Sequence, residues 1–134
     1  MPAQVTIWHN PACGTSRNTL EIIRAAGVEP VVVDYLKSGW DRATLQRLAV
    51  GTGQGVRGLL RDKGTPAAAL GLLEPGVADE AILLAMLKHP VLVNRPIVET
   101  PLGMRLCRPS ETVFGLLDRP PSSFTKEDGE TIRS

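Results

Sequence analysis

Residues 5–20 read VTIWHNPACGTSRNTL, and the rest of the architecture can be inferred from them. The apolar run Val5–Trp8 predicts a β-strand, and Leu20–Ala26 carries apolar residues at helical spacing. Cys13 therefore falls in the turn where the strand ends and the helix begins. A helix N-terminus has unpaired N–H groups and about half a positive charge, so it favours a thiolate over a thiol and can hold an anion.

The residues after the cysteine support a reactive thiol. The backbone N–H groups of Gly14, Thr15 and Ser16 predict a concave seat for an anion, although ordinary helix capping without a ligand is the alternative. A lone cysteine is commonly a small buried hydrophobe. The neighbours of Cys13 are small or polar rather than apolar, and this favours the reactive interpretation.

A second strand follows the helix. Val31–Val33 is β-branched throughout and apolar on both faces, which predicts a buried central strand. Gly27 stands where the helix before it should end. Strand, helix and strand at this spacing predict a right-handed βαβ unit with parallel strands.

The middle of the chain is predicted to be helical, and its end returns to strand and helix. The expected elements are helices at Asp41–Val50, Val56–Arg61 and Asp79–Lys88, capped in the first and third by Asp41 and Asp79, a β-hairpin of Ile97–Thr100 with Met104–Cys107, and a helix Ser110–Leu117 capped by Ser110.

This order predicts an α/β fold. A βαβ unit beside a ββα unit, with a cysteine at the first strand–helix turn, describes a thioredoxin-like mixed sheet with a helical insertion at about 37–89. We expect one domain over residues 1–118. Residues 119–134 are rich in Pro, Ser, Thr, Gly and charge, which predicts a loosely ordered tail.

Two arginines flank the predicted hairpin. Counted outward from Leu102 at its tip, Arg95 and Arg108 face each other at the open end. Like charges at opposed positions destabilise a hairpin, and a bound anion would relieve the repulsion. Two solvated surface arginines are the alternative. Pro96 follows Arg95, and thioredoxin-like proteins place a cis-proline against the reactive cysteine, but the sequence leaves this isomer open.

Composition narrows the class of protein. The chain has 134 residues, 43% of them hydrophobic and 22% charged, with a net charge of +1, so no overall field attracts nucleic acid or a membrane surface. We expect no secretion signal, no membrane span and a cytoplasmic location. Two cysteines make no disulfide framework, and two histidines without matching cysteine spacing predict no metal site.

Several stretches carry a resemblance to a known family: Thr6–Leu20, Val56–Arg61, His89–Ile97, Thr100–Gly103, Arg105–Glu111 and Lys126–Glu130. They resemble bacterial arsenate reductases of the glutaredoxin-coupled, glutathione-dependent type. The resemblance covers nearly the whole chain, and its most specific part is the motif His-Asn-Pro-x-Cys-Gly-Thr-Ser-Arg-Asn. It implies reduction of arsenate to arsenite for arsenic detoxification, through a covalent thiol–arsenate intermediate.

The resemblance also implies roles for single residues. Cys13 would be the nucleophile, while Arg61, Arg95 and Arg108 would bind the oxyanion. His9 would help to keep the thiolate, either as a cation or as a neutral hydrogen-bonding group. Glutathione would be the reductant and glutaredoxin the protein partner, with no bound cofactor. Cys107 matches a position without an assigned redox role, and we expect a buried thiol there.

Two other functions remain open at this point. Redox-sensing regulators that bind RNA polymerase share the superfamily, but they typically carry a Cys-x-x-Cys switch, which Ser16 removes here. A general glutaredoxin-like thiol oxidoreductase is the second alternative, and three arginines around the thiol would be surplus to that task.

Overall fold

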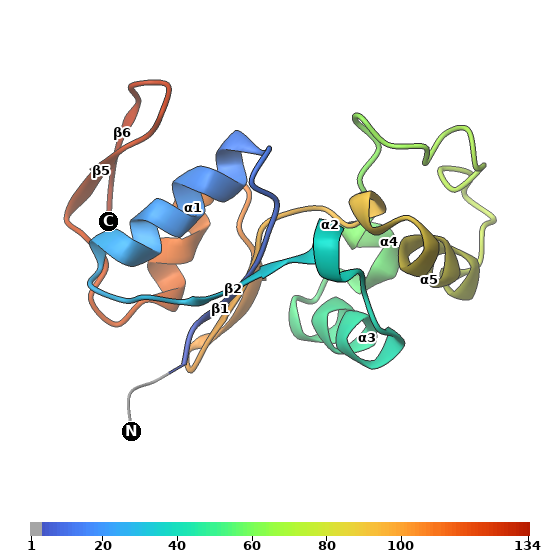
Figure 1. Ribbon diagram of the computed structural model, residues 1–134, viewed down its shortest axis with the longest axis horizontal. Helices are drawn as coiled ribbons and strands as arrows, with labels where there is room; N and C mark the ends of the chain where they lie inside the picture. Colours follow the sequence, from blue (N-terminus) through green and yellow to red (C-terminus); the bar gives the residue numbers. More distant parts are fainter. Residues whose placement is uncertain (1–3) are drawn as a thin grey trace. The chain divides into compact units, whose positions relative to one another are not determined.

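The computed structural model describes residues 4–134, which fold as two compact units (Figure 1). One unit combines both ends of the chain, the part up to Asp34 and Arg95–Ser134, and the other is Tyr35–Asn94. The second unit includes the predicted helical insertion. The expectation that residues 1–118 behave as one domain stays a prediction.

The first unit contains a mixed four-stranded sheet. Its strands are β1 (Thr6–His9), β2 (Val31–Asp34), β3 (Ile97–Thr100) and β4 (Gly103–Leu106), in the order β2-β1-β3-β4. β1 runs parallel to β2 and antiparallel to β3, and β4 forms the predicted hairpin with β3. The α/β fold with a thioredoxin-like mixed sheet is thereby confirmed.

Helices α1 (Gly14–Ala25) and η2 (Ser110–Leu116) pack against each other and against the sheet (Figure 1). Ile22 and Ile23 from α1 are fully buried beside Ile7 and Val98 from the two central strands. Burial of each such side chain stabilises the fold by roughly 1.5–3 kcal/mol, so this cluster holds α1 against the sheet.

β2 differs from the central strand that was predicted. It is an edge strand, and Val31 and Val32 are 45% and 40% exposed. A run of β-branched residues specifies a strand but not its number of neighbours. β1, which is hydrogen-bonded on both sides, takes the central place.

The C-terminal helix also differs from its prediction. η2 is a 3-10 helix, its N-cap is Pro109, and Ser110 lies inside it without capping it. The chain is extended at Pro109, with φ −67° and ψ 167°, so the cap position falls on Pro109 and Ser110 is the first residue of the helix.

The expected loose tail is instead ordered. Strands β5 (Ser123–Thr125) and β6 (Thr131–Arg133) form an antiparallel hairpin in which Phe124 pairs with Ile132. Ile132 is 9% exposed and belongs to the core cluster of the first unit. The polar composition of the segment led to the wrong prediction of a loose tail. Two apolar residues that pair across a short hairpin are enough to anchor it.

The second unit is helical. Its elements are α2 (Tyr35–Ser38), α3 (Arg42–Gly51), α4 (Gly55–Leu59), α5 (Asp79–Lys88) and η1 (Pro90–Leu92). Asp41 caps α3 as predicted, since its Oδ2 accepts a hydrogen bond of 3.0 Å from Thr44 N. Asp79 is not a cap but the first residue of α5. Within residues 4–134, no helix has the length and apolar character that a membrane crossing requires.

Candidate functional site

Cys13 is the N-cap residue of α1 and is held there by backbone hydrogen bonds. Its N–H donates to Asn10 O at 3.0 Å, and its carbonyl accepts from Arg17 N at 2.9 Å. Asn10 Oδ1 closes the turn by accepting from Ala12 N at 2.9 Å. The loop is therefore built by its own sequence, and it leaves the thiol 9% exposed.

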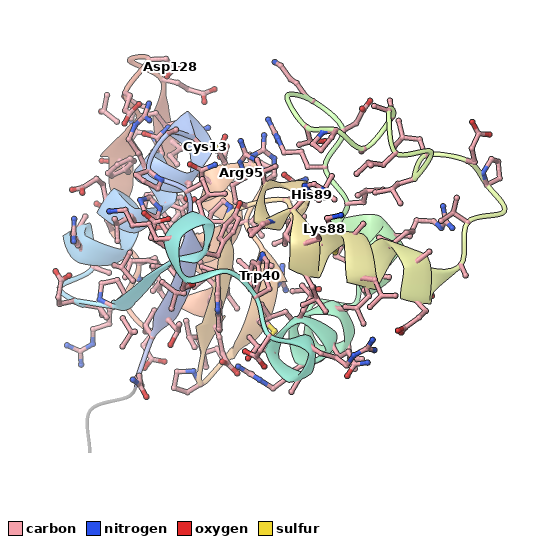
Figure 2. All side chains as sticks on the ribbon, turned by 45° about the vertical axis from the view of Figure 1, so that its right-hand side comes forward. Cys13, Trp40, Lys88, His89, Arg95 and Asp128 are labelled. Carbon is pink, nitrogen blue, oxygen red and sulfur yellow. The ribbon has the colours of Figure 1, made fainter. Side chains whose placement is uncertain are left out.

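The surroundings of the thiol favour its charged form. Burial alone would raise the pKa of Cys13, but hydrogen bonds from the Ser16 N–H and from the Arg95 and Arg108 side chains lower it to about 7. Arg108 Nη1 lies 3.7 Å from Cys13 Sγ. Figure 2 shows Arg95 beside the cysteine. At neutral pH a large share of the thiol is consequently ionised.

The β3–β4 hairpin brings the two arginines together at its open end. Ile97 pairs with Leu106, and beyond that pair Cys107 N donates to Pro96 O at 2.9 Å. Arg108 Nη1 also donates to Arg95 O at 2.9 Å. The peptide bonds that follow the two arginines, before Pro96 and Pro109, are both cis.

His9 lies at the end of β1, 6% exposed, and supports the loop through Ser16. Its Nδ1 is 2.6 Å from Ser16 Oγ, and that oxygen also accepts from Asn10 N at 3.1 Å. Burial lowers the pKa of His9, and the opposing influence of Asp34 does not reverse the shift. This favours the neutral imidazole over the cation among the two roles that the resemblance left open.

Arg61 belongs to the second unit, where it follows α4. Its Nη1 donates to Asn94 Oδ1 at 3.1 Å, and its Nε donates to Lys63 O at 3.1 Å. Its backbone N–H bonds Leu92 O at 2.8 Å. The approach of Arg61 to a bound oxyanion stays a prediction.

Cys107 has the properties of a structural thiol. It is fully buried among apolar side chains, and its Sγ is 3.7 Å from Arg105 O. Burial raises the pKa of Cys107 to about 12, so the sulfur stays protonated at any physiological pH.

Sequence reasoning missed one pair at this site, Arg17 with Glu127. Arg17 stands inside the cysteine motif, but its partner comes from the hairpin of β5 and β6, in the segment expected to be loose. No local pattern links two residues that are more than a hundred positions apart. The alternation around Phe124 and Ile132 was the one available signal that this segment is ordered.

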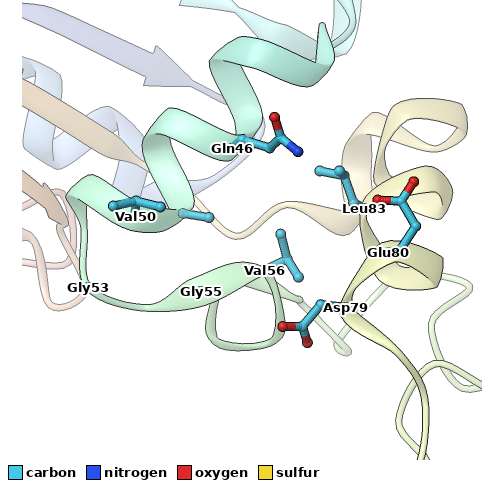
Figure 3. Close-up of a pocket in the computed structure, with 9 residues that line it drawn as sticks. Gln46, Val50, Gly53, Gly55, Val56, Asp79, Glu80 and Leu83 are labelled. Atoms are coloured by element: carbon cyan, nitrogen blue, oxygen red, sulfur yellow. The ribbon is translucent and has the colours of Figure 1, made fainter.

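A hollow lies wholly within the second unit, and its lining differs from the surroundings of Cys13 (Figure 3). Its volume is about 510 Å³, and Val50, Val56 and Leu83 give it an aliphatic surface. The charged side chains that line it are those of Asp79 and Glu80, and Glu80 forms an ion pair with Arg42. None of the described residues that line this hollow is a cysteine, so it offers no nucleophilic sulfur.

A measurable consequence of this geometry is the pH dependence of Cys13. We expect its alkylation by iodoacetamide to reach half of its maximal rate at about pH 7, because the thiolate is the reactive form and its pKa is lowered. Rates measured from pH 5 to 10, with peptide mapping to separate Cys13 from Cys107, provide the test. A midpoint near 9 would mean that the arginines do not act on the sulfur.

Comparisons with known proteins point to one family. The family model described as "ArsC family" matches residues 8–115. An arsenate reductase of Rhizobium meliloti is 57% identical over 96% of this chain and 92% of its own, and one of Escherichia coli K12 is 51% identical over 97% and 93%. The solved structure of an arsenate reductase from Vibrio cholerae, 36% identical, superposes with a TM-score of 0.81 over 87% of this chain and 100% of that one.

Proposed function

Since the chain belongs to the ArsC family, we propose that it reduces arsenate to arsenite, with the Cys13 thiolate as the nucleophile. One observation carries the proposal: a thiol whose pKa is lowered to about 7 lies against two guanidinium groups at a helix N-terminus. Arsenic resistance is the biological role of such a reaction. The fold supports it further through its likeness to the arsenate reductase of Vibrio cholerae.

The first chemical step joins sulfur to arsenic. The Cys13 thiolate attacks As(V), an As–O bond breaks, and the oxygen leaves as water after it takes up protons. Arg95 and Arg108 balance the negative charge of the arsenate oxygens, and the N–H groups of Gly14, Thr15 and Ser16 are proposed to bind the same anion. Of these three groups, the Ser16 N–H bonds the Cys13 sulfur. Charge stabilisation of this kind is usually the largest contribution that a protein makes to such a transfer.

Two electrons must then reach arsenic to give As(III). Cys13 supplies one of the two sulfurs of a disulfide, and an external thiol supplies the other, so that arsenite leaves as the S–S bond forms. Cys107 is unsuited to be that second sulfur, because it is buried and its pKa is raised to about 12. Ser16 stands where a Cys-x-x-Cys partner would be.

We assign the external thiol to glutathione, and the thiol that frees Cys13 from the mixed disulfide to a glutaredoxin. The pattern of cysteines supports this choice, since a chain with one reactive cysteine depends on an outside donor. Two unlinked cysteines also suit a reducing compartment, and we therefore place the reaction in the cytoplasm.

The proposal is tested by arsenate-dependent oxidation of NADPH in the presence of glutathione, glutathione reductase and glutaredoxin. We expect NADPH oxidation that needs arsenate, glutathione, glutathione reductase and glutaredoxin together. Turnover with a dithiol donor but not with glutathione and glutaredoxin would support arsenate reduction and reject glutathione and glutaredoxin as the source of electrons. Absence of turnover with either donor would reject the reaction, and it would favour a redox-sensing regulator or a general thiol oxidoreductase.

A further inference from the structure

An ion pair joins the cysteine motif to the C-terminal hairpin. Arg17 Nε donates to Glu127 Oε2 at 2.8 Å, and Arg17 Nη2 donates to Glu127 Oε1 at 3.0 Å, so the contact is bidentate. The third nitrogen, Nη1, donates to Pro11 O at 2.8 Å, two residues before the thiol. The guanidinium is thereby held between the reactive loop and the hairpin.

The pair lies directly beside the proposed anion seat. A Cβ placed on Gly14 would be 3.7 Å from both Arg17 Nη2 and Glu127 Oε1, so the ion pair borders the first residue of α1. The charge of Cys13 contributes to raising the pKa of Arg17, after the larger influence of Glu127. Arg17 therefore senses a negative charge at the position of the thiolate.

The carboxylate is held in this place by the fold. Glu127 N donates to Asn18 Oδ1 at 3.0 Å, and the neighbouring Lys126 makes ion pairs with Glu111 at 2.9 Å and Glu130 at 2.8 Å. The side chains of Arg17 and Glu127 are 42% and 48% exposed, and ion pairs that exposed add little to stability. Their main effect is on the local electric field.

We propose that Glu127 limits the affinity of this site for tetrahedral oxyanions, because its carboxylate engages Arg17 and reduces the positive charge that such an anion meets. The inference rests on the proposed function for the identity of the substrate. It adds a residue from the C-terminal hairpin to a site otherwise built from the motif of Cys13 and the hairpin of Arg95 and Arg108.

The expected effect applies to phosphate and arsenate alike. Inorganic phosphate has the same shape and charge as arsenate, so guanidinium groups do not separate the two well in the ground state. A carboxylate that weakens the reversible binding of both anions therefore lowers the occupancy by phosphate and leaves the ratio of the two affinities unchanged. Phosphate can for this reason serve as the probe of the effect.

The test measures protection of Cys13 from iodoacetamide by inorganic phosphate at one pH, without any turnover. We expect the half-protecting phosphate concentration to fall about fivefold in Glu127→Gln, because a charge near the site is removed and Arg17 becomes available to the anion. Glu127→Asp keeps the charge, and its value should stay within about twofold of the unsubstituted protein.

Glu29→Gln is the matched control. Glu29 makes the same kind of exposed contact with Arg24, at 3.1 Å and 3.2 Å, at the other end of α1. The Glu29→Gln substitution removes the same charge as Glu127→Gln, but at the other end of α1. The half-protecting phosphate concentration should therefore stay within about twofold of the unsubstituted value. Equal effects in Glu29→Gln and Glu127→Gln would reduce the result to net charge and overturn the proposal.

The direction in which Glu127→Gln changes phosphate protection of Cys13 separates an electrostatic role from a structural one. If Glu127 only braced the loop, Glu127→Gln would loosen Arg17 and weaken protection, and weaker or unchanged protection overturns the inference. Failure of arsenate reduction with tighter phosphate protection in Glu127→Gln would reject the reaction and keep the electrostatic role. Normal arsenate reduction with no change in phosphate protection would keep the proposed reaction and reject the electrostatic role of Glu127.

Discussion

Cys13→Ser is expected to lower arsenate turnover by at least ~10³-fold. A serine hydroxyl is hardly ionised at neutral pH, whereas the pKa of Cys13 is lowered to about 7. Oxygen also cannot supply the sulfur of the disulfide through which arsenic receives its electrons. Because serine is a favourable N-cap residue, α1 should remain intact. Coupled NADPH oxidation at saturating glutathione and glutaredoxin measures the loss.

The matching control is Cys107→Ala, which removes the other sulfur. Cys107 is fully buried and its raised pKa keeps it protonated, so most turnover should remain. The substitution leaves a small cavity in the core, and we expect a loss of about 1–2 kcal/mol in the free energy of unfolding. If Cys107→Ala abolished turnover in a folded protein while Cys13→Ser retained it, the assignment of the nucleophile would be wrong.

Arg108→Ala should lower kcat/KM for arsenate by about 30- to 1000-fold, which corresponds to about 2–4 kcal/mol of transition-state stabilisation. The guanidinium lies 3.7 Å from Cys13 Sγ and bonds Arg95 O at 2.9 Å. Its removal therefore takes away a positive charge and releases the second arginine. The pKa of Cys13 should rise in the same variant, which the pH dependence of alkylation will report.

Two further variants separate charge from geometry. Arg108→Lys keeps a cation, but a lysine ammonium cannot offer an oxyanion the planar, bidentate donors of a guanidinium, so an intermediate kcat/KM is expected. Arg105→Ala removes an arginine that is exposed on β4, and it should leave kcat/KM nearly unchanged. Equal losses in Arg105→Ala and Arg108→Ala would show that only the overall charge matters.

The sequence was sufficient for the parts of the site that local patterns control. An apolar run, a glycine and a polar turn placed Cys13 at a helix start, and the register of a hairpin placed Arg95 opposite Arg108. Each inference needed only the period of a strand or helix and the position of a turn. The inference of an oxyanion-binding site followed from these positions, because guanidinium groups beside a thiolate are well suited to bind an anion.

Features that depend on contacts between distant segments were not predictable in the same way. Glu127 reaches Arg17 only because the C-terminal hairpin folds back, and composition had suggested a loose tail. β2 is an edge strand because β1 and β3 occupy the two central positions of the sheet. Neither outcome is written in a local pattern, since both depend on which strands meet in three dimensions.

The division of the first unit between the two ends of the chain has a consequence for biosynthesis. β1 needs β3 as its second neighbour, yet the ribosome must make all of Tyr35–Asn94 between them, which takes seconds at ordinary elongation rates. Ile132 belongs to the same core cluster. The core that supports the loop of the nucleophile can therefore be completed only after Ile97–Thr100 and Ile132 have been synthesised.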